Sequence, residues 1–371
     1  IYSHGDAQAL NGQTINISGG SVSGDGGTGE LSATGNVSFS GSVIGYAKDG
    51  YDTGSFIIDP LTATVSGSFG ADTTVWAEDG IDINGATSID TTSGNVTLTL
   101  LADHATATPG DWDIGGGSGT ATLGTITRSG AFTIAESGTT PANTATLVMK
   151  AGDDASNNSI GTSASPILTN VDVLNIEVNP ASTGDVFITE TGAVDLSGVS
   201  IGNSRNLVLS AGGSITDSGL VTVGGTASIT TTTTDEDIDL NQLAVAGAID
   251  VNTTGTTANA TIVNTTAIDL AASNVGGDLT ATATAGNIID SGTLTVGGVA
   301  SFTTSAPSAT IDLGSLAVTG SVAVNTNGAT GSATIVNATA LDFATSSVGF
   351  DLNATATTGN ITQTGSLTVT G

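Results

Sequence analysis

An internal repeat, present at residues 214–286 and again at 287–359, constrains this chain of 371 residues more than any other feature of its sequence. The two copies align without a gap, and 43 of the 73 positions are identical. The letters ATIVNTTAIDLA at 260–271, for example, return as ATIVNATALDFA at 333–344. Self-similarity at a fixed period is typical of an array in which each unit buries its apolar side against the next unit.

The repeat itself subdivides into short segments of alternating apolar and polar residues. Similar phrases open at Leu294, Leu316, Leu341 and Leu367, at nearly equal spacings. A strand with such alternation has one buried face and one wet face. The interval between successive phrases accommodates two or three short strands with their turns, which is the size of one coil of a parallel β-helix. The spacings therefore predict three coils per repeat.

The composition favours an all-β fold. Gly is abundant at 53 residues, the apolar residues are mostly Val, Ile, Leu and Ala, and good helix formers are scarce. We predict a right-handed parallel β-helix (β-solenoid) of roughly 15 coils at about 24 residues per coil. The alternative is a chain of tandem β-sandwich domains, one per repeat. Sandwiches usually have a Trp or Tyr core, and residues 287–359 contain only Phe302, Phe343 and Phe350 as aromatics.

The regularity of the spacing divides the chain into two regions. Residues 1–212 contain similar strand and turn sequences at irregular intervals, so we expect a solenoid with longer loops there. Residues 213–371 should form the regular array, divided into 213–286, 287–359 and a partial copy at 360–371.

Charge and cysteine content exclude several classes of protein. Lys and Arg total 4 against 34 Asp and Glu, so the net charge is −30. Binding to nucleic acid requires cations opposite the phosphates, and four basic residues cannot supply them. With no cysteine, a disulfide framework, a thiolate metal site and a Cys nucleophile are also excluded. We expect no transmembrane segment, because no apolar run approaches about 18 residues.

Three similar phrases carry a resemblance to a known family. GNITQTGSLTVTG at 359–371, GNIIDSGTLTVGG at 286–298 and GGSITDSGLVTVGG at 212–225 resemble repeats of very large bacterial surface exoproteins. These are the filamentous-haemagglutinin-like adhesins of two-partner secretion. The resemblance implies a right-handed β-helix, export, and roles in adhesion, aggregation or fibre formation. The sequence lacks an Asn-Pro-Asn-Gly secretion signature and an Arg-Gly-Asp triplet, so neither secretion route nor receptor is carried over.

A surface of Thr, Ser, Asn and Asp without cysteines fits a secreted or cell-surface protein. The chain begins at Ile1 without a basic or apolar leader, so we expect that any signal peptide has already been removed. We therefore expect a structural or adhesive protein with no catalytic residues and no required cofactor, forming a fibre, sheath or adhesin stalk. Its expected partners are further copies of itself, stacked head to tail, and a host or neighbouring cell surface or a polysaccharide.

The densest acidic cluster is the one candidate for a metal site. Asp235, Asp237 and Asp239 alternate along a predicted strand, so their carboxylates share one face. Carboxylate oxygens are the ligands that calcium prefers, and calcium is the only cofactor that the sequence suggests. The competing interpretation is a solvated turn. It is supported by the equivalent residues 308–312, where only Asp312 is acidic, and by the lack of any calcium-loop motif.

The alternative function is a carbohydrate-binding or carbohydrate-active β-helix. A lyase would have to take its base from the four residues Lys48, Arg128, Lys150 and Arg205. A hydrolase needs two converging carboxylates, and the candidates lie where we expect insertions, around 104–119 and 138–165: Asp111, Asp113, Asp153 and Asp154. The two histidines, His4 and His104, are too few for a histidine metal site.

Overall fold

The computed structural model describes residues 2–3, 5–9, 12–48, 51–102, 124–138, 143–152 and 158–371. All regular elements in these residues are β-strands, and all the strand pairs are parallel. The fold is a parallel β-solenoid of about 14 turns, which confirms the prediction from the sequence. The sandwich alternative is wrong, because sandwiches are built from antiparallel sheets. No helix in the described ranges is long and apolar enough to cross a membrane.

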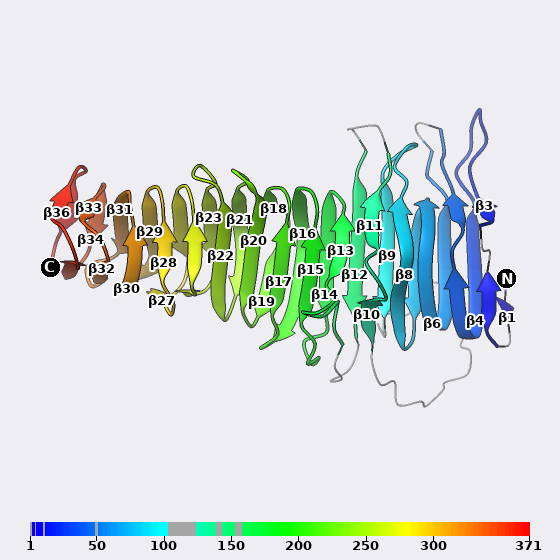
Figure 1. Cartoon of the computed structure of the whole chain (residues 1–371), viewed down its shortest axis with the longest axis horizontal. Helices are drawn as coiled ribbons and strands as arrows, with labels where there is room; N and C mark the ends of the chain where they lie inside the picture. Colours follow the sequence, from blue (N-terminus) through cyan, green and yellow to red (C-terminus); the bar gives the residue numbers. More distant parts are fainter. Residues whose placement is uncertain are drawn as a thin grey trace. The chain divides into compact units, whose positions relative to one another are not determined.

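The chain divides into two compact units. Unit 1 contains residues 1–192 and 200–203, and unit 2 contains residues 193–199 and 204–371 (Figure 1). β16 (Val194–Asn203) contributes residues 194–199 to unit 2 and residues 200–203 to unit 1.

The remaining strands of unit 1 are β1 (Tyr2–Ser3), β2 (Ala7–Ala9), β3 (Thr14–Asn16), β4 (Thr28–Phe39), β5 (Ser42–Ile44), β6 (Ser55–Gly70), β7 (Asp72–Ala77), β8 (Gly80–Ile89), β9 (Val96–Ala102), β10 (Thr125–Arg128), β11 (Thr133–Glu136), β12 (Ala145–Ala151), β13 (Ile167–Asn170), β14 (Val173–Val178) and β15 (Val186–Glu190). Their coils differ in length. Ser55 of β6 pairs with the nearby Asp72 of β7, whereas Thr146 of β12 pairs with Val173 of β14, which is more distant in the sequence.

The remaining strands of unit 2 are β17 (Leu207–Ala211), β18 (Ile215–Asp217), β19 (Val221–Gly224), β20 (Ala227–Thr234), β21 (Ile238–Val245), β22 (Ala248–Thr254), β23 (Ala260–Asn264), β24 (Ile268–Leu270), β25 (Ser273–Val275), β26 (Leu279–Ala283), β27 (Ile288–Asp290), β28 (Leu294–Val296), β29 (Ala300–Pro307), β30 (Ile311–Val318), β31 (Ser321–Asn327), β32 (Ala333–Asn337), β33 (Leu341–Phe343), β34 (Ser346–Val348), β35 (Leu352–Ala356), β36 (Ile361–Gln363) and β37 (Leu367–Val369).

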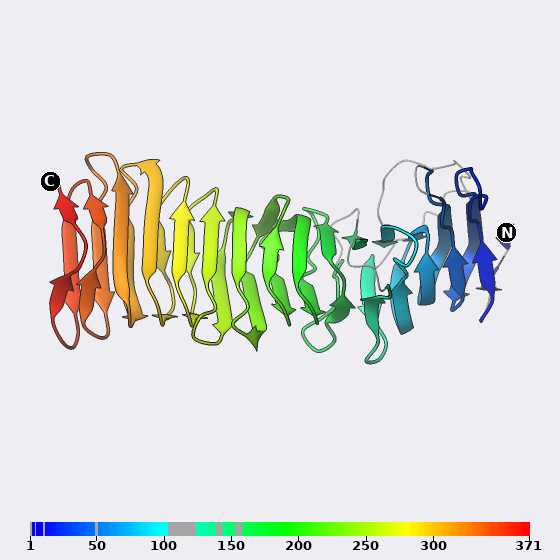
Figure 2. The same cartoon turned by 90° about the horizontal axis from the view of Figure 1, so that it is seen from above.

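Two columns of paired strands form unit 2, and Figure 2 shows its strands stacked one after another. The first wall consists of β18 with β19, then β21, β23, β26, β29, β31, β33 with β34, and β36 with β37. The second wall consists of β17, β20, β22, β24 with β25, β27 with β28, β30, β32 and β35. The chain crosses from one wall to the other after each pass. The coils of unit 2 also differ slightly in length, since the coil from Ala260 to its partner Leu279 is shorter than the one from Ile238 to Ala260.

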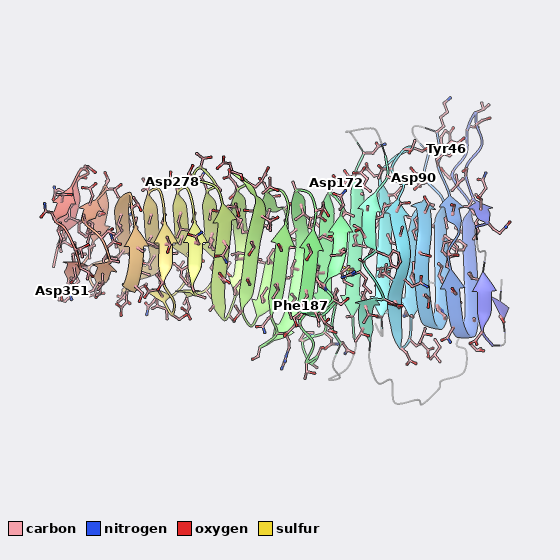
Figure 3. The ribbon with its side chains drawn as sticks, in the orientation of Figure 1. Tyr46, Asp90, Asp172, Phe187, Asp278 and Asp351 are labelled. Atoms are coloured by element: carbon pink, nitrogen blue, oxygen red, sulfur yellow. The ribbon has the colours of Figure 1, made fainter. Side chains whose placement is uncertain are left out.

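The repeat covers seven passes, which is three and a half coils. Every strand from β18 to β28 therefore returns one repeat later with the same strand core but on the opposite wall. β23 on the first wall, for example, corresponds to β32 on the second. The three leucine spacings predict three coils per repeat, and this count is too low by half a coil. Leu294 and Leu316 lie on the second wall, whereas Leu341 and Leu367 lie on the first, so one spacing contains an additional pass. Asp278 and Asp351, equivalent in the repeat, lie at opposite edges of unit 2 in Figure 3.

The interior of unit 2 is filled by rows of apolar side chains. Along β29, Ala300 and Phe302 are fully buried, and the intervening Ser301 and Thr303 are only half-buried. The strand pairing places Ala300 over Leu279, so each apolar side chain lies against another from the next coil. This is the alternation read from the sequence, and it confirms that each coil needs its neighbours to bury its apolar side.

We expect Phe302→Ala to lower the free energy of unfolding by about 3–5 kcal/mol, because the fully buried ring would leave a cavity between coils. Phe350→Ala is the matched control: this ring is 45 % exposed, and its loss should cost less than about 1 kcal/mol. Guanidinium unfolding followed by circular dichroism measures both values. Equal losses in the two variants would contradict the assignment of Phe302 to the interior.

Candidate functional site

A fully buried asparagine joins successive coils in unit 2. Asn264, at the end of β23, is 0 % exposed. Its Oδ1 accepts a hydrogen bond from the backbone N–H of Val245 at 2.9 Å, and its Nδ2 donates to the Val245 carbonyl at 3.0 Å. The same Nδ2 donates to the carbonyl of Ala267 at 2.7 Å. A buried amide is tolerated in an apolar interior only when its polar atoms are bonded in this way.

The opposite wall carries the same arrangement one repeat later. Asn337 is also 0 % exposed, and it bonds the N–H of Val318 at 2.9 Å and the carbonyl of Val318 at 3.0 Å. Thr339 adds a bond from its hydroxyl to the same carbonyl at 3.0 Å. The identical residues of the two repeats therefore include those that hold coils together. Sequence reasoning missed this role, although the identity of Asn264 and Asn337 was a signal that could have found it.

Aspartates connect successive coils at a second corner. The carboxylate of Asp217 accepts hydrogen bonds from the backbone N–H groups of Asn241 at 2.9 Å and Gln242 at 2.8 Å. Asp290 repeats both bonds, to the N–H groups of residues 314 and 315, at 2.9 and 2.7 Å. Each carboxylate thus satisfies two amides of the following coil where the strand bends and its ladder register shifts.

Stacking in register also brings carboxylates close together. Burial raises the pKa of Asp217 above its ordinary value, and repulsion from Asp239 and Asp195 raises it further. The two backbone amides that bond Asp217 act in the opposite direction on its pKa. The acidic residues therefore interact along the stack even where they are far apart in sequence.

The three aspartates of the predicted calcium site lie at and just after a turn. Asp235 has a left-handed backbone (φ 64°), as does the equivalent Ser308 (φ 66°), and short polar residues adopt this conformation more readily than others. The Asp235 Oδ1 accepts a bond from the N–H of Thr257 at 3.1 Å. The turn itself thus explains a small polar residue at this position in both repeats.

Asp237 and Asp239 bond to separate partners. Asp237 Oδ1 accepts from the N–H of Asn259 at 2.7 Å, and Asp239 Oδ1 accepts from the side-chain amide of Asn241 at 2.5 Å. Across the described ranges, no three His, Cys, Asp or Glu side chains form a group that could hold a metal ion. Calcium binding at Asp235, Asp237 and Asp239 stays a prediction.

The residues considered for an enzyme are placed only in part. Lys150 forms an ion pair with Glu177 on the neighbouring strand at 2.9 Å, and Arg128 Nε donates to the carbonyl of Pro166 at 2.9 Å. Lys48 follows β5, and Arg205 lies between β16 and β17. The other candidates lie outside the described residues: His4, His104, Asp111, Asp113, Asp153 and Asp154. The whole of the expected insertion at 104–119 and parts of the one at 138–165 lie outside them too.

Two carboxyl groups with raised pKa in unit 1, one buried and one half-buried, were not singled out from the sequence. Glu190 is 2 % exposed, and its oxygens accept bonds from the N–H groups of Gly192 at 2.8 Å and Val171 at 3.2 Å. Burial raises the pKa of Glu190, against the effect of these bonds. Asp59 of β6 is the second: burial raises its pKa to about 6, with further contributions from the charges of Glu30 and Glu78.

Comparison with known families concerns the regular array. A family model described as repeats of unknown function (DUF5649) matches residues 183–254, 257–309 and 330–371. Together with the solenoid, this match defines the class: the chain is a β-helix repeat protein. Comparisons with the curated proteins and with the solved structures gave no match.

We expect Asn264→Ala to destabilise unit 2 by about 1–3 kcal/mol, because it leaves the buried N–H of Val245 without its partner, while the carbonyl of Val245 keeps only its bond from the Thr266 hydroxyl. The exposed Asn274, on β25 of the same unit, supplies the control variant Asn274→Ala, which should change stability by less than about 0.5 kcal/mol. Denaturant unfolding compares the two. A neutral Asn264→Ala would show that water replaces the amide without loss.

The raised pKa of Asp59 predicts a pH dependence of stability. The folded chain binds a proton at this carboxyl more tightly than the unfolded chain does, so protonation stabilises the folded state. This contribution is complete below about pH 4 and is lost as the pH rises to about 6. Asp59→Asn should therefore flatten the dependence of the melting temperature on pH across this window. Equal slopes in wild type and Asp59→Asn would contradict the assignment.

Proposed function

We propose that the chain is a secreted structural or adhesive protein of the filamentous-haemagglutinin-like kind, which forms a fibre, sheath or adhesin stalk at the cell surface. In this proposal it has no catalytic activity and needs no cofactor, and length is its useful property. Its subunits stack head to tail, and its outer face meets a neighbouring cell surface or polysaccharide.

One observation carries the proposal: the repeat extends unit 2 without changing its construction. Each repeat adds three and a half coils, and the strands, the Asn264 bonds and the Asp217 bonds all return one repeat later. A chain built this way gains length with each repeat at nearly constant cross-section. An active site, by contrast, needs a local departure from the repeat.

The ladder between coils supports stacking. β30 pairs with β32 and β32 pairs with β35, each time through the backbone and in parallel register. A strand edge of this kind is a template for a further parallel strand, so one subunit can add to the next as one coil adds to another. Identical ends that join head to tail do not close, and they therefore give a filament.

The charge of the chain bears on how such filaments would associate. A net charge of −30 with four basic residues makes lateral contacts between neighbouring chains repulsive. End-to-end contacts through the backbone ladder are affected much less, because they join strand edges. Salt or divalent cations that screen this charge should therefore promote lateral bundling.

Negative-stain microscopy and light scattering over a range of concentrations test the proposal. We expect fibres whose length grows with concentration, and bundles of them when salt or magnesium is added. Monodisperse particles without fibres at every concentration would contradict it.

Paired variants locate the contact. Ile361→Asp puts a charge on β36 and should shorten or abolish the fibres. Ile289→Asp is the matched control, since Ile289 is 42 % exposed on the outer face of β27 and should leave the fibres unchanged. Circular dichroism checks that both variants are folded. Loss of fibres in both variants, or in neither, would exclude end-to-end stacking through β36.

A further inference from the structure

The peptide bond between Asp59 and Pro60 occupies an unusual place in unit 1. It is the only Asp-Pro bond in the sequence, and it lies inside β6. On the side of the following coil, residues 55–58 pair with β7 and residues 62–69 pair with β8, so the bond lies where one partner strand is replaced by the next. Proline has no N–H, so the nitrogen of this bond contributes nothing to the backbone ladder.

Acidic groups face Asp59 from the strands on both sides. Glu30 of β4 lies in the preceding coil, where Ser32 is the direct pairing partner of Asp59. Glu78, in the turn after β7, lies in the following coil, and its backbone N–H donates to the carbonyl of Pro60 at 3.3 Å. The neighbouring Asp79 donates its N–H to the carbonyl of Leu61 at 2.8 Å. The described neighbours of this carboxyl are thus acidic rather than basic, and Asp59 itself is only half-buried, so water reaches it.

We propose that the bond between Asp59 and Pro60 is a self-cleavage site: the chain hydrolyses its own backbone there at weakly acidic pH. This activity is independent of the structural role proposed above. No metal, cofactor or partner is required, and the second substrate is water.

The chemistry uses groups that the bond itself provides. One side-chain oxygen of Asp59 attacks the main-chain carbonyl carbon of the same residue, and the carboxyl proton passes to the nitrogen of Pro60. The bond between that carbon and the nitrogen breaks, and the nitrogen keeps the electron pair and leaves as a secondary amine. A five-membered cyclic anhydride remains on Asp59, and water opens it to two carboxyl groups. The net reaction consumes one water molecule and yields fragments 1–59 and 60–371. The attack is intramolecular, so the nucleophile is already at high effective concentration.

The folded environment should accelerate this reaction. The reacting form carries one proton on the Asp59 carboxyl, so the rate follows the protonated fraction. With the pKa raised to about 6, a large fraction of the carboxyl is protonated at pH 6, against under about 1 % for an ordinary aspartate, a gain of more than about tenfold. Glu30 and Glu78 contribute to this gain through their negative charges.

The cleaved chain should stay folded. The residues before the bond remain paired with β4 and β7, and those after it with β4, β5 and β8. The break would remove no ladder hydrogen bond of the Pro60 nitrogen, because it makes none. Cleavage would therefore create a new amino terminus at Pro60 without releasing either fragment under native conditions.

Incubation of the purified full chain at pH 5.5–6 and at pH 8, followed by denaturing electrophoresis, intact mass measurement and amino-terminal sequencing, tests the proposal. We expect two fragments whose new terminus is Pro60, formed at least tenfold faster at the acidic pH. The same chain unfolded in guanidinium at pH 6 should cleave at least about tenfold more slowly, because Asp59 then has its ordinary pKa. Ordinary acid lability predicts the opposite order, with the unfolded chain cleaving at least as fast.

Variants separate self-cleavage from a contaminating protease and from loss of folding. Asp59→Asn removes the attacking carboxylate and should abolish the cleavage, and Pro60→Ala, which restores a secondary amide, should do the same. Glu30→Gln with Glu78→Gln keeps the bond but lowers the pKa of Asp59, so the rate at pH 6 should fall several-fold and recover at lower pH. Glu136→Gln should cleave like wild type. Cleavage that persists in Asp59→Asn, a missing Pro60 terminus, or equal rates in folded and unfolded chains would overturn the proposal.

Discussion

The parallel backbone ladder between successive coils is the interaction on which the rest of this structure depends. Each coil can bond its N–H and C=O groups only if the next coil presents its own groups in register. The register then fixes which side chains face inward, so Ala300 lies over Leu279 and the apolar rows become continuous. Some of the polar residues inside bond backbone groups that the ladder leaves unpaired. Asn264 and Asp217 lie at such places, beside bends at which the pairing of β21 changes register.

The half-coil in each repeat carries the bonds between coils from one wall to the other. Equivalent residues lie on opposite walls, so the two copies present their outward-facing residues on different faces of unit 2. A residue that bonds a neighbouring coil has the same partner on either wall, because the partner belongs to the same repeat and changes walls together with it. Asn264 and Asn337 therefore share their bonds as well as their identity. Asp235 and Ser308 differ in identity but share a left-handed turn, and each bonds the equivalent threonine of the next coil, Thr257 or Thr330.

Much of the fold could be predicted from the sequence, because alternation, turn residues and period all describe a stack of short strands. The number of coils per repeat could not, since two similar phrases on opposite walls look the same in sequence as two on one wall. The acidic cluster around Asp59 was missed for a related reason. Glu30, Asp59 and Glu78 are far apart in the sequence, and only the irregular coil lengths of unit 1 bring the three together. Those lengths are not periodic, so no pattern in residues 1–192 reveals the contact.

Stacking in register also determines how this fold handles its charge. Charges from neighbouring coils act together on one carboxyl, as those of Asp195 and Asp239 do at Asp217 and those of Glu30 and Glu78 do at Asp59. Asp217 and Asp290 each bond a pair of backbone N–H groups, so these carboxylates also connect coils. At Asp217 the two amide bonds oppose the rise in pKa that burial causes. Burial, Glu30 and Glu78 all raise the pKa of Asp59, and a labile bond follows this residue. If this chain does chemistry of its own, it should be sought where the repeat is broken.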